Sequence, residues 1–257
     1  MPAPPIALSR DEVHVHCTWL DGLDDPALLA SYAELMTPEE RARNARYLFE
    51  RSRREHLVGR ALVRTTLSRY ADVAPGAWRF REGERGRPEI EGPAGAPPLR
   101  FNLSHTTGLV AVAVAIDRDV GVDVEDAARQ RTTAEIADRF FSPREVADLR
   151  ALPAADQRDR FFTYWTLKEA YIKAVGLGLA IPLDHFTFLL EPPGPLAIAF
   201  APERDDDPSA WQFERWRPSA RHHLAMAVRR GAGPDLRVIV RDVVPFADAR
   251  ARSGSSG

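Results

Sequence analysis

The chain has 257 residues, of which 44% are hydrophobic and 28% charged, so it can bury a core as one large domain or two smaller ones. Its 35 Lys and Arg against 37 Asp and Glu give a formal net charge of −2, which argues against a general nucleic-acid-binding protein. A single cysteine excludes an intramolecular disulfide framework. No apolar run approaches the roughly 20 residues that cross a bilayer, and the N-terminus lacks a signal-peptide pattern. We expect a soluble, cytoplasmic protein without a membrane or nucleic-acid partner.

The basic residues are almost all arginines. Only Lys168 and Lys173 are lysines, and the other 33 of the 35 are arginines. A compositional bias of the source genome explains this ratio. The alternative is that these two positions require a compact ammonium group with three donors instead of a planar guanidinium. The composition leaves both explanations open.

In chain order, the first predicted element is a short strand over 13–19. Thr37-Pro38-Glu39-Glu40 then predicts a helix start, with a hydroxyl N-cap, Pro at N1 and Glu at N3, where it can close a capping box. An amphipathic helix is expected over 52–70. The strands expected after it lie at 77–81, 99–102 and 110–116.

The second half repeats this order. A strand is predicted over 120–125, a second Ser-Pro-x-Glu start lies at Ser142, and an amphipathic helix is expected over 159–175. The strands expected after it lie at 186–190, 196–200, 211–215 and 224–228. The order β-α-α-β-β-β therefore occurs twice, which predicts an α+β fold of two similar α/β halves packed as a pseudo-two-fold intramolecular dimer. The alternative is coincidence between two ordinary helix starts.

We place the two halves at 1–117 and 118–247, followed by a flexible tail at 248–257. The Pro- and Gly-rich stretches at 91–98 and 191–195 predict loops between strands. Ligand sites in such proteins tend to lie between the halves.

Asp123 and Glu125 lie two residues apart on the strand predicted over 120–125, so they share one face of it. Two adjacent carboxylates repel each other unless a positive charge lies between them, and Mg²⁺ prefers such carboxylate oxygens. A solvated strand end explains the same pattern without a metal.

Glu169 and Lys173 are separated by four residues on the helix predicted over 159–175, so they are neighbours on one helix face. A surface ion pair is the ordinary interpretation of this spacing. The helix also carries Lys168 and several aromatic residues. A carboxylate between two ammonium groups fits a phosphate-binding site that contains an acid or base.

Ser104 and His105 follow an apolar strand and could hold a phosphate, although Asn, Ser and Gly are also ordinary turn residues. Their side chains diverge on an extended chain, so we do not interpret them as a nucleophile pair. The histidine pairs His14–His16 and His222–His223 have no partners at metal-ligand spacing. We interpret these four histidines as surface or half-buried residues.

Five motifs, in this order and spacing, resemble the Sfp-type 4′-phosphopantetheinyl transferases of the holo-carrier-protein synthase superfamily. They are Gly86-Arg87-Pro88, Phe101-Asn102-Leu103-Ser104-His105, Gly121-Val122-Asp123-Val124-Glu125, the segment 139–145 and the segment 165–179. Each motif is weak or moderate by itself, whereas the five together are highly specific. The duplicated halves extend the resemblance to most of the chain.

The resemblance implies a monomeric enzyme. It moves the phosphopantetheine arm of coenzyme A to a serine of an apo acyl or peptidyl carrier protein, and it releases 3′,5′-ADP in a Mg²⁺-dependent reaction. Such carriers belong to fatty-acid, polyketide, nonribosomal-peptide or aminoadipate pathways, and the sequence does not indicate which carrier is used, or whether acyl-coenzyme A is accepted. The segment 126–139 and its arginines are expected to contribute to carrier docking.

The resemblance also implies the roles of particular residues, with metal and catalysis in the second half. The metal ligands would be Asp123, Glu125 and Glu145, all supplied by protein. Glu169 would be the base that takes the serine proton, directly or through water, and Lys173 would bind the pyrophosphate. Lys168 is a neighbouring candidate for coenzyme A binding.

The nucleotide side of coenzyme A would lie against the first half. Ser104 and His105, with Asn102 of the same motif, match contacts to the 3′-phosphate end, and Arg54 is a further candidate there. The matching adenine-side loop is Gly86-Arg87-Pro88, in which arginine replaces the family's lysine. Glu40 occupies a position at which some relatives carry a cation. Whether Arg41, Arg43 or Arg46 contacts a phosphate of coenzyme A is therefore left open.

Two functions of other classes remain as alternatives. One is a non-catalytic module that binds coenzyme A or a nucleotide, and the other is a Mg²⁺-dependent nucleotide phosphodiesterase. The carboxylates at 123, 125 and 145 together with Glu169 argue against a pure binding module, because binding alone does not require a base.

Overall fold

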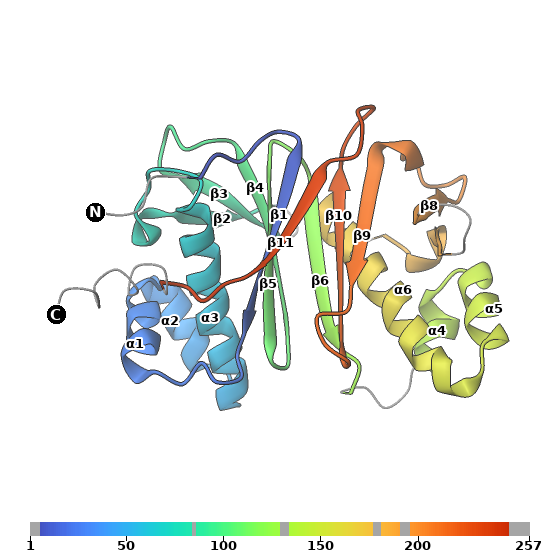
Figure 1. Cartoon of the computed structure of the whole chain (residues 1–257), viewed down its shortest axis with the longest axis horizontal. Helices are drawn as coiled ribbons and strands as arrows, with labels where there is room; N and C mark the ends of the chain where they lie inside the picture. The colour runs from blue at the N-terminus through green and yellow to red at the C-terminus, as the bar shows by residue number, and fades with distance from the viewer. Residues whose placement is uncertain (1–5, 84–85, 129–133, 177–180, 191–195, 247–257) are drawn as a thin grey trace. The chain divides into compact units, whose positions relative to one another are not determined.

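The computed structural model describes residues 6–83, 86–128, 134–176, 181–190 and 196–246. The chain divides into two compact units, one comprising Met1–Asp117 with Arg237–Gly257 and the other Arg118–Leu236 (Figure 1). The loop predicted at 191–195, the tail at 248–257 and residues 177–179 of the last motif lie outside the described residues.

The first unit begins with a strand and three helices. These are β1 (Glu12–Trp19), α1 (Pro26–Glu34), α2 (Pro38–Ala45) and α3 (Glu50–Leu67). After the short 3₁₀ helix η1 (Pro75–Ala77), the strands are β2 (Arg79–Glu82), β3 (Pro88–Gly92), β4 (Leu99–Thr106) and β5 (Leu109–Ile116). One sheet has the order β11-β1-β5-β4, and β2 pairs with β3 as a separate hairpin.

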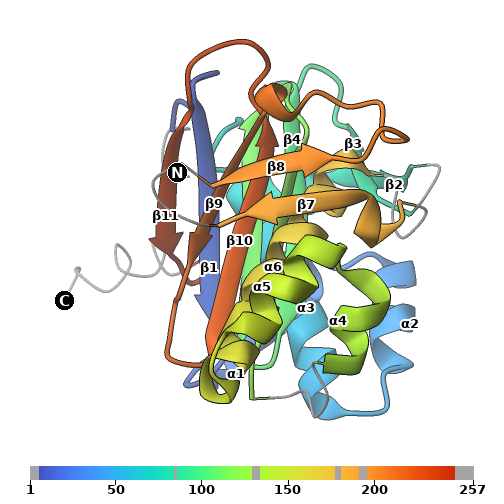
Figure 2. The same ribbon diagram turned by 90° about the vertical axis from the view of Figure 1, so that its right-hand side faces the viewer.

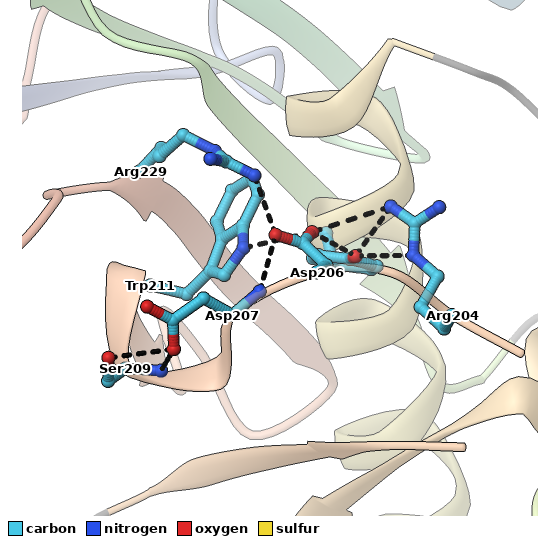
Figure 3. Close-up of polar contacts among 7 residues, drawn as sticks. Arg204, Asp206, Asp207, Ser209, Trp211 and Arg229 are labelled. Atoms are coloured by element: carbon cyan, nitrogen blue, oxygen red, sulfur yellow. Dashed lines mark hydrogen bonds and ion pairs between the residues drawn. The ribbon is translucent and has the colours of Figure 1, made fainter. Parts of the chain in front are cut away.

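The second unit also begins with a strand and three helices. These are β6 (Val120–Asp126), α4 (Ala134–Phe140), α5 (Pro143–Ala151) and α6 (Ala154–Val175). The remaining elements are η3 (Leu183–His185), β7 (Phe186–Leu189), β8 (Ala197–Phe200), η4 (Pro208–Ala210), β9 (Trp211–Trp216) and β10 (His222–Arg229). One sheet has the order β6-β10-β9, and the β7–β8 hairpin crosses in front of β9 and β10 in Figure 2.

The two units share one topology. In each, a strand is followed by three helices, a hairpin and two more strands, and the sheet orders β1-β5-β4 and β6-β10-β9 correspond strand by strand. The predicted α+β fold with two similar halves is therefore confirmed at the level of topology. Each unit contains one helix more than the predicted order, and β3 in the first unit was missed because it begins with Pro88 and is rich in charge.

The last strand departs from the predicted division. Strand β11 (Arg237–Asp242) runs parallel to β1, with Glu12 opposite Arg237 and Cys17 opposite Asp242. It therefore belongs to the first unit, whereas the sequence placed residues up to 247 in the second half. This pairing joins segments more than 220 residues apart, and no local pattern signals it.

Both predicted helix starts are confirmed. Thr37 caps α2 and Ser142 caps α5, each with Pro at N1, and in both helices the glutamate at N3 closes a capping box. The Ser142 N–H donates to Glu145 Oε2 at 2.9 Å, and the Thr37 N–H donates to Glu40 Oε2 at 3.0 Å. These caps define the residue at which each short helix begins and satisfy N–H groups of its first turn.

The long helices cover their sheets in both units. Helix α3 packs its apolar face on β4 and β5, and α6 packs on β6 and β10 (Figure 1).

The histidines at 14, 16, 222 and 223 are buried, so the expectation of surface or half-buried positions was wrong. In the first unit, His14 Nδ1 and His16 Nε2 lie 2.7 and 2.5 Å from the Tyr70 hydroxyl. No helix among the described residues is long and apolar enough to span a membrane.

Candidate active site

Strand β6 turns two carboxylates toward helix α6. Gly121, Asp123 and Glu125 alternate with valines, so they share one face of the strand. A Cβ at position 121 would lie 2.1 Å from the Ala170 carbonyl oxygen and 2.4 Å from the Ala174 nitrogen. The face of β6 that carries Gly121 therefore faces α6, and glycine permits this close approach of strand and helix.

Helix α6 supplies the opposite wall with Glu169 and Lys173. The Lys173 ammonium donates to Asp123 Oδ1 at 2.6 Å, so the last turn of the helix is tied directly to β6. The helix ends at Gly176, whose φ of 75° is a left-handed C-cap conformation that glycine adopts without strain. The structure thus brings Asp123 of β6 together with Glu169 and Lys173 of α6, which come much later in the sequence.

The carboxylates of this cluster are electrostatically crowded. Burial raises the pKa of Glu125 to about 7, with the nearby charges of Asp123 and Glu169 adding to the rise. Lys173 and a hydrogen bond from the Trp165 side chain oppose that rise. Burial, followed by the charge of Asp123, also raises the pKa of Glu169. Burial and the neighbouring carboxylates thus favour the protonated forms of Glu125 and Glu169, and the charge of Lys173 opposes this.

The chemistry of this donor set fits Mg²⁺. Hard carboxylate oxygens are the protein ligands that Mg²⁺ prefers, and a divalent cation relieves the mutual repulsion that raises the pKa of Glu125. The side chains do not form a ready-made metal site, because no group of three or more His, Cys, Asp or Glu among the described residues is arranged to hold an ion. An ion pair with Lys173 engages Asp123.

Glu145 and Lys168 lie outside this cluster, in the core of the second unit. Both side chains are fully buried, and Lys168 Nζ lies 2.7 Å from Glu145 Oε2. Glu145 Oε2 also accepts the Ser142 N–H, and its Oε1 accepts the Phe188 N–H at 2.8 Å. Both carboxylate oxygens of Glu145 are therefore already bonded within the core. This geometry contradicts the assignment of Glu145 as a metal ligand.

Lys168 is likewise committed to the core. Besides Glu145, its ammonium donates to the carbonyl oxygens of Leu183 and Phe186, both at 2.7 Å, and it lies 4.3 Å from the centre of the Phe186 ring. Burial lowers the pKa of Lys168, and the charge of Glu145 opposes that effect. An ammonium with three protein acceptors and no solvent exposure does not bind coenzyme A, so the predicted binding role of Lys168 is also corrected.

Arg54, which the sequence predicts at the 3′-phosphate, forms hydrogen bonds within the first unit. Its Nη2 donates to the carbonyl oxygens of Leu20 and Leu23, and it lies 2.6 Å from Asp24 Oδ1. These bonds attach α3 to the connection between β1 and α1. The guanidinium is engaged by the protein itself, which argues against the predicted contact with coenzyme A.

Ser104 and His105 project to opposite faces of β4. Ser104 is buried and His105 is exposed, as strand alternation requires. His105 Nδ1 lies 3.6 Å from the buried carboxylate of Glu55 on α3. Asn102 is buried and lies on the same face of β4 as Ser104, so of the three polar residues in this motif only His105 projects from the other face.

The Gly86-Arg87-Pro88 motif borders a hollow of the first unit. The hollow has a volume of about 110 Å³ and is lined by Arg81, Arg87 and Arg100, together with Glu89 and apolar side chains of β3 and β4. Gly86 has a φ of 78°, which suits glycine at the turn before Arg87. Three guanidinium groups around one hollow fit an anionic ligand. Glu89 lies 2.8 Å from Arg81 and 3.9 Å from Arg100.

Sequence reasoning missed three contributors to these sites. The Trp165 side chain hydrogen-bonds Glu125. Its position one helical turn before Glu169 could have indicated that it lies beside the carboxylate cluster. Gly121 permits the contact between β6 and α6, and the absence of a side chain beside two carboxylates could have indicated it. Arg100 reaches the hollow from β4, and its position between two buried residues of a strand could have marked the outer face.

Known proteins with similar sequences belong to the family that the five motifs indicate. A profile described as the 4′-phosphopantetheinyl transferase superfamily matches residues 119–228, and a profile of the N-terminal part of 4′-phosphopantetheinyl transferases matches residues 25–117. The chain is 38% identical over 204 residues to 4′-phosphopantetheinyl transferase HetI from Nostoc sp., covering 79% of this chain and 84% of that protein. The chain therefore belongs to the 4′-phosphopantetheinyl transferase superfamily, which confirms the resemblance.

Two further proteins are similar to the chain. Sfp, a 4′-phosphopantetheinyl transferase of Bacillus subtilis, is 33% identical over 167 residues, which cover 65% of this chain and 72% of Sfp. Among solved structures, a holo-(acyl-carrier-protein) synthase from Bacillus anthracis in complex with CoA (3′,5′-ADP) matches with 18% identity and a TM-score of 0.37. That match covers 43% of this chain and 93% of the synthase. The family assignment establishes the chain as a 4′-phosphopantetheinyl transferase.

Proposed function

We propose that this enzyme transfers the 4′-phosphopantetheine arm of coenzyme A to a serine of an apo acyl or peptidyl carrier protein, with Mg²⁺ as its metal. The observation that carries the proposal is the arrangement of β6 against α6. It places Lys173 Nζ 2.6 Å from Asp123 Oδ1 and sets Glu125 and Glu169 within the same electrostatic cluster. The names of HetI and Sfp support the same reaction.

Asp123, Glu125 and Glu169 are the residues we propose to hold the metal, with Glu169 replacing Glu145 as the third ligand. All three are carboxylates, and a bound cation would favour the charged forms of Glu125 and Glu169, whose pKa values burial and the neighbouring carboxylates raise. Bound Mg²⁺ would neutralise charge on the phosphoryl oxygens. Trp165 would hold Glu125 in place through its side-chain hydrogen bond.

Glu169 also acts as the base in this proposal. In the transfer, the carrier serine oxygen forms a bond to the β-phosphorus of coenzyme A, and the bond from that phosphorus to the bridging oxygen of the leaving 3′,5′-ADP breaks. The serine proton passes to the Glu169 carboxylate, directly or through one water. Burial raises the pKa of Glu169, which favours uptake of the proton, whereas a bound cation would lower that pKa.

Lys173 supplies the fixed positive charge for the pyrophosphate. Its side chain is partly exposed, unlike that of Lys168, and its ammonium is oriented by Asp123. A compact ammonium can bring its donors to phosphate oxygens beside a carboxylate, where a planar guanidinium needs more room. Lys173 is therefore the lysine to which we assign substrate binding.

The nucleotide end of coenzyme A fits the arginine-lined hollow of the first unit. Arg87 was expected there, and the structure adds Arg81 and Arg100 on the neighbouring strands. His105 is exposed beside Glu55 and remains a candidate for the 3′-phosphate. We propose in addition that the enzyme acts as a cytoplasmic monomer on carriers of fatty-acid, polyketide or nonribosomal-peptide synthesis.

Incubation with coenzyme A, Mg²⁺ and each of several apo carrier proteins tests the proposal. Mass spectrometry of the carrier should show the addition of one phosphopantetheine arm, and chromatography should show an equal amount of 3′,5′-ADP. Chelation of divalent metal should stop the reaction, and added Mg²⁺ should restore it. Hydrolysis of coenzyme A without a carrier would indicate a phosphodiesterase instead, and the absence of any reaction with all carriers would contradict the proposal.

A further inference from the structure

The connection between α2 and α3 exposes two large apolar side chains side by side. Leu48 is 86% exposed and Phe49 is 69% exposed, whereas the next most exposed large apolar residue among the described ones, Ile6, is 43% exposed. Neither Leu48 nor Phe49 belongs to the core of the first unit. Exposed apolar surface of this kind in a soluble protein marks an interaction site when it is concentrated at one place.

Phe49 also occupies a position that favours a different residue type. It is the N-cap of α3, with φ −99° and ψ 134°, and its side chain makes no capping hydrogen bond. Ser, Thr, Asp or Asn at this position would satisfy an N–H of the first helical turn and would also favour contact with water. The chain therefore carries an apolar residue where both local stability and solubility favour a polar one. Such local conflicts are expected at functional surfaces.

The surroundings of this pair are strongly basic. Between residues 41 and 53 the chain has five arginines and one acidic residue, Glu50, although the whole chain has a net charge of −2. We define the α2–α3 patch by the exposed residues Arg43, Arg46, Leu48, Phe49, Arg51 and Arg53. An apolar centre with a positive rim is complementary to an apolar centre with a negative rim.

The backbone of the α2–α3 patch is held in place by hydrogen bonds. Asn44 Nδ2 donates to the Arg53 carbonyl oxygen at 2.7 Å, and Arg53 Nε donates to the Tyr47 carbonyl oxygen at 2.8 Å. The Tyr47 N–H donates to the Asn44 carbonyl oxygen at 3.2 Å. These bonds link the end of α2 to the start of α3 across the connection. The apolar pair is thus presented on a fixed loop, which lowers the entropy cost of binding a partner.

From these observations we infer that the α2–α3 patch docks an acidic amphipathic helix of the carrier protein. The inference rests on the proposed transfer to a carrier, and it adds the surface and the chemistry by which the carrier is recognised. Leu48 and Phe49 insert among the apolar residues of that helix, and the arginines face its acidic residues. A second copy of this chain is the less favoured occupant, because a copy would bring its own arginines to the same contact.

Steady-state kinetics of full-length variants test the inference. The double variant Leu48→Ser/Phe49→Ser should raise KM for the carrier by about tenfold or more, as expected for a central apolar anchor. Its KM for coenzyme A and its kcat should stay within about twofold of wild type. Val240→Ser, which alters an exposed aliphatic residue of β11, is the matched control and should leave all three parameters unchanged.

Charge is tested separately. Arg46→Glu should raise KM for the carrier most at low ionic strength, and the difference from wild type should shrink as salt is added. Arg10→Glu, at an exposed surface ion pair with Asp117, is the charge control. A rise in KM for coenzyme A alone would overturn the inference, because the patch would then serve the nucleotide. Unchanged KM values in both sets of variants would also overturn it.

Carrier binding without turnover separates this inference from the proposed function. If wild type transfers nothing but binds a labelled apo carrier, and the Leu48→Ser/Phe49→Ser variant loses that binding, the docking surface stands while the transfer proposal fails. If transfer proceeds and the variant binds the carrier as wild type does, the docking surface fails while the transfer proposal stands. A wild-type dimer that the variant converts to monomer would assign the patch to self-association and overturn the inference.

Discussion

Lys168 Nζ lies 2.7 Å from Glu145 Oε2, and both side chains are completely buried. The ammonium has three hydrogens, and the core offers three acceptors: Glu145 and the carbonyl oxygens of Leu183 and Phe186. An arginine has five donors and a larger planar head, which this closed environment could not satisfy. One of the two lysines in an arginine-rich chain is therefore explained by packing instead of by catalysis.

The first unit contains a related arrangement. Glu40, the capping-box glutamate of α2, lies 2.9 Å from Arg64 on α3, just as Glu145 of α5 pairs with Lys168 on α6. Arg64 is buried, and its guanidinium lies 5.0 Å from the centre of the Phe80 ring. In both units the glutamate at N3 caps its own helix and neutralises a buried cation of the long helix. This arrangement, present in both units, supports an internal duplication more strongly than the weak residue-by-residue match between the two halves does.

Replacement of Lys168 should therefore destabilise the fold. Lys168→Met leaves the buried carboxylate of Glu145 without its cation, which should lower the free energy of unfolding by about 3–5 kcal/mol. Lys168→Arg should lower it by about 1–3 kcal/mol, because the added volume has no space in a closed core. Denaturant unfolding followed by circular dichroism measures both. A Lys168→Arg protein as stable as wild type would contradict the role of the three-acceptor environment.

Replacement of Lys173 should act on catalysis instead. Lys173 is partly exposed whereas Lys168 is fully buried, so Lys173→Met should lower the free energy of unfolding less than Lys168→Met does. Transfer to a carrier should nevertheless fall strongly, and Lys173→Arg should also be impaired because a guanidinium cannot take the same position beside Asp123. Initial rates of transfer compared with unfolding curves separate the two lysines. Wild-type rates for Lys173→Arg would show that only the charge is required.

The contrast between the two lysines shows what the sequence could and could not predict. The helix starts at Thr37 and Ser142 and the alternation along β6 were predictable, because the signals lie within a few residues. The role of Lys168 was not, because its acceptors come from positions 145, 183 and 186, which only the folded core brings together. The pairing of β11 with β1 was missed for the same reason.

Glu169→Gln should separate catalysis from binding. The amide keeps the size of the side chain but cannot accept the serine proton, so transfer should fall by about 10²–10⁴-fold. Coenzyme A affinity, measured by calorimetry, should change much less, because Lys173 and the arginines of the first unit are retained. Equal losses of transfer and of affinity would argue that Glu169 binds substrate instead of accepting the proton.

Gly121→Ala should weaken the packing of α6 on β6. The added Cβ would lie 2.1 Å from the Ala170 carbonyl oxygen, and backbone on both sides cannot move aside without shifting the helix. We expect a loss of stability of about 1–3 kcal/mol together with reduced transfer, because the shift moves Glu169 and Lys173 relative to Asp123. Gly76→Ala is the control, since a Cβ there would meet nothing within 4 Å. Equal activity of both variants would contradict the importance of this contact.

The buried histidines should make the stability of the first unit depend on pH. Burial lowers the pKa of His16 from its ordinary value near 6.5 to about 3, and burial also lowers the pKa of His14. Because the pKa of His16 is lower in the folded chain, the unfolded chain binds more protons than the folded chain at any pH between the folded-state pKa and the ordinary pKa of histidine. The contribution of neutral His16 is therefore fully present above pH 6.5 and is lost as the pH falls toward 3, at up to about 1.4 kcal/mol per pH unit.

The variant His16→Gln isolates this effect, because Gln can still hydrogen-bond the Tyr70 hydroxyl but cannot take up a proton near neutral pH. Carboxylates elsewhere titrate alike in both proteins, so they cancel in the difference between the two curves of unfolding free energy against pH. That difference should be flat above pH 6.5, and below it wild type should lose stability more steeply than the variant. Parallel curves from pH 7.5 to 4.5 would mean that the pKa of His16 is not lowered in the folded protein, so that His16 can be protonated there while its Nε2 donates to the Tyr70 hydroxyl.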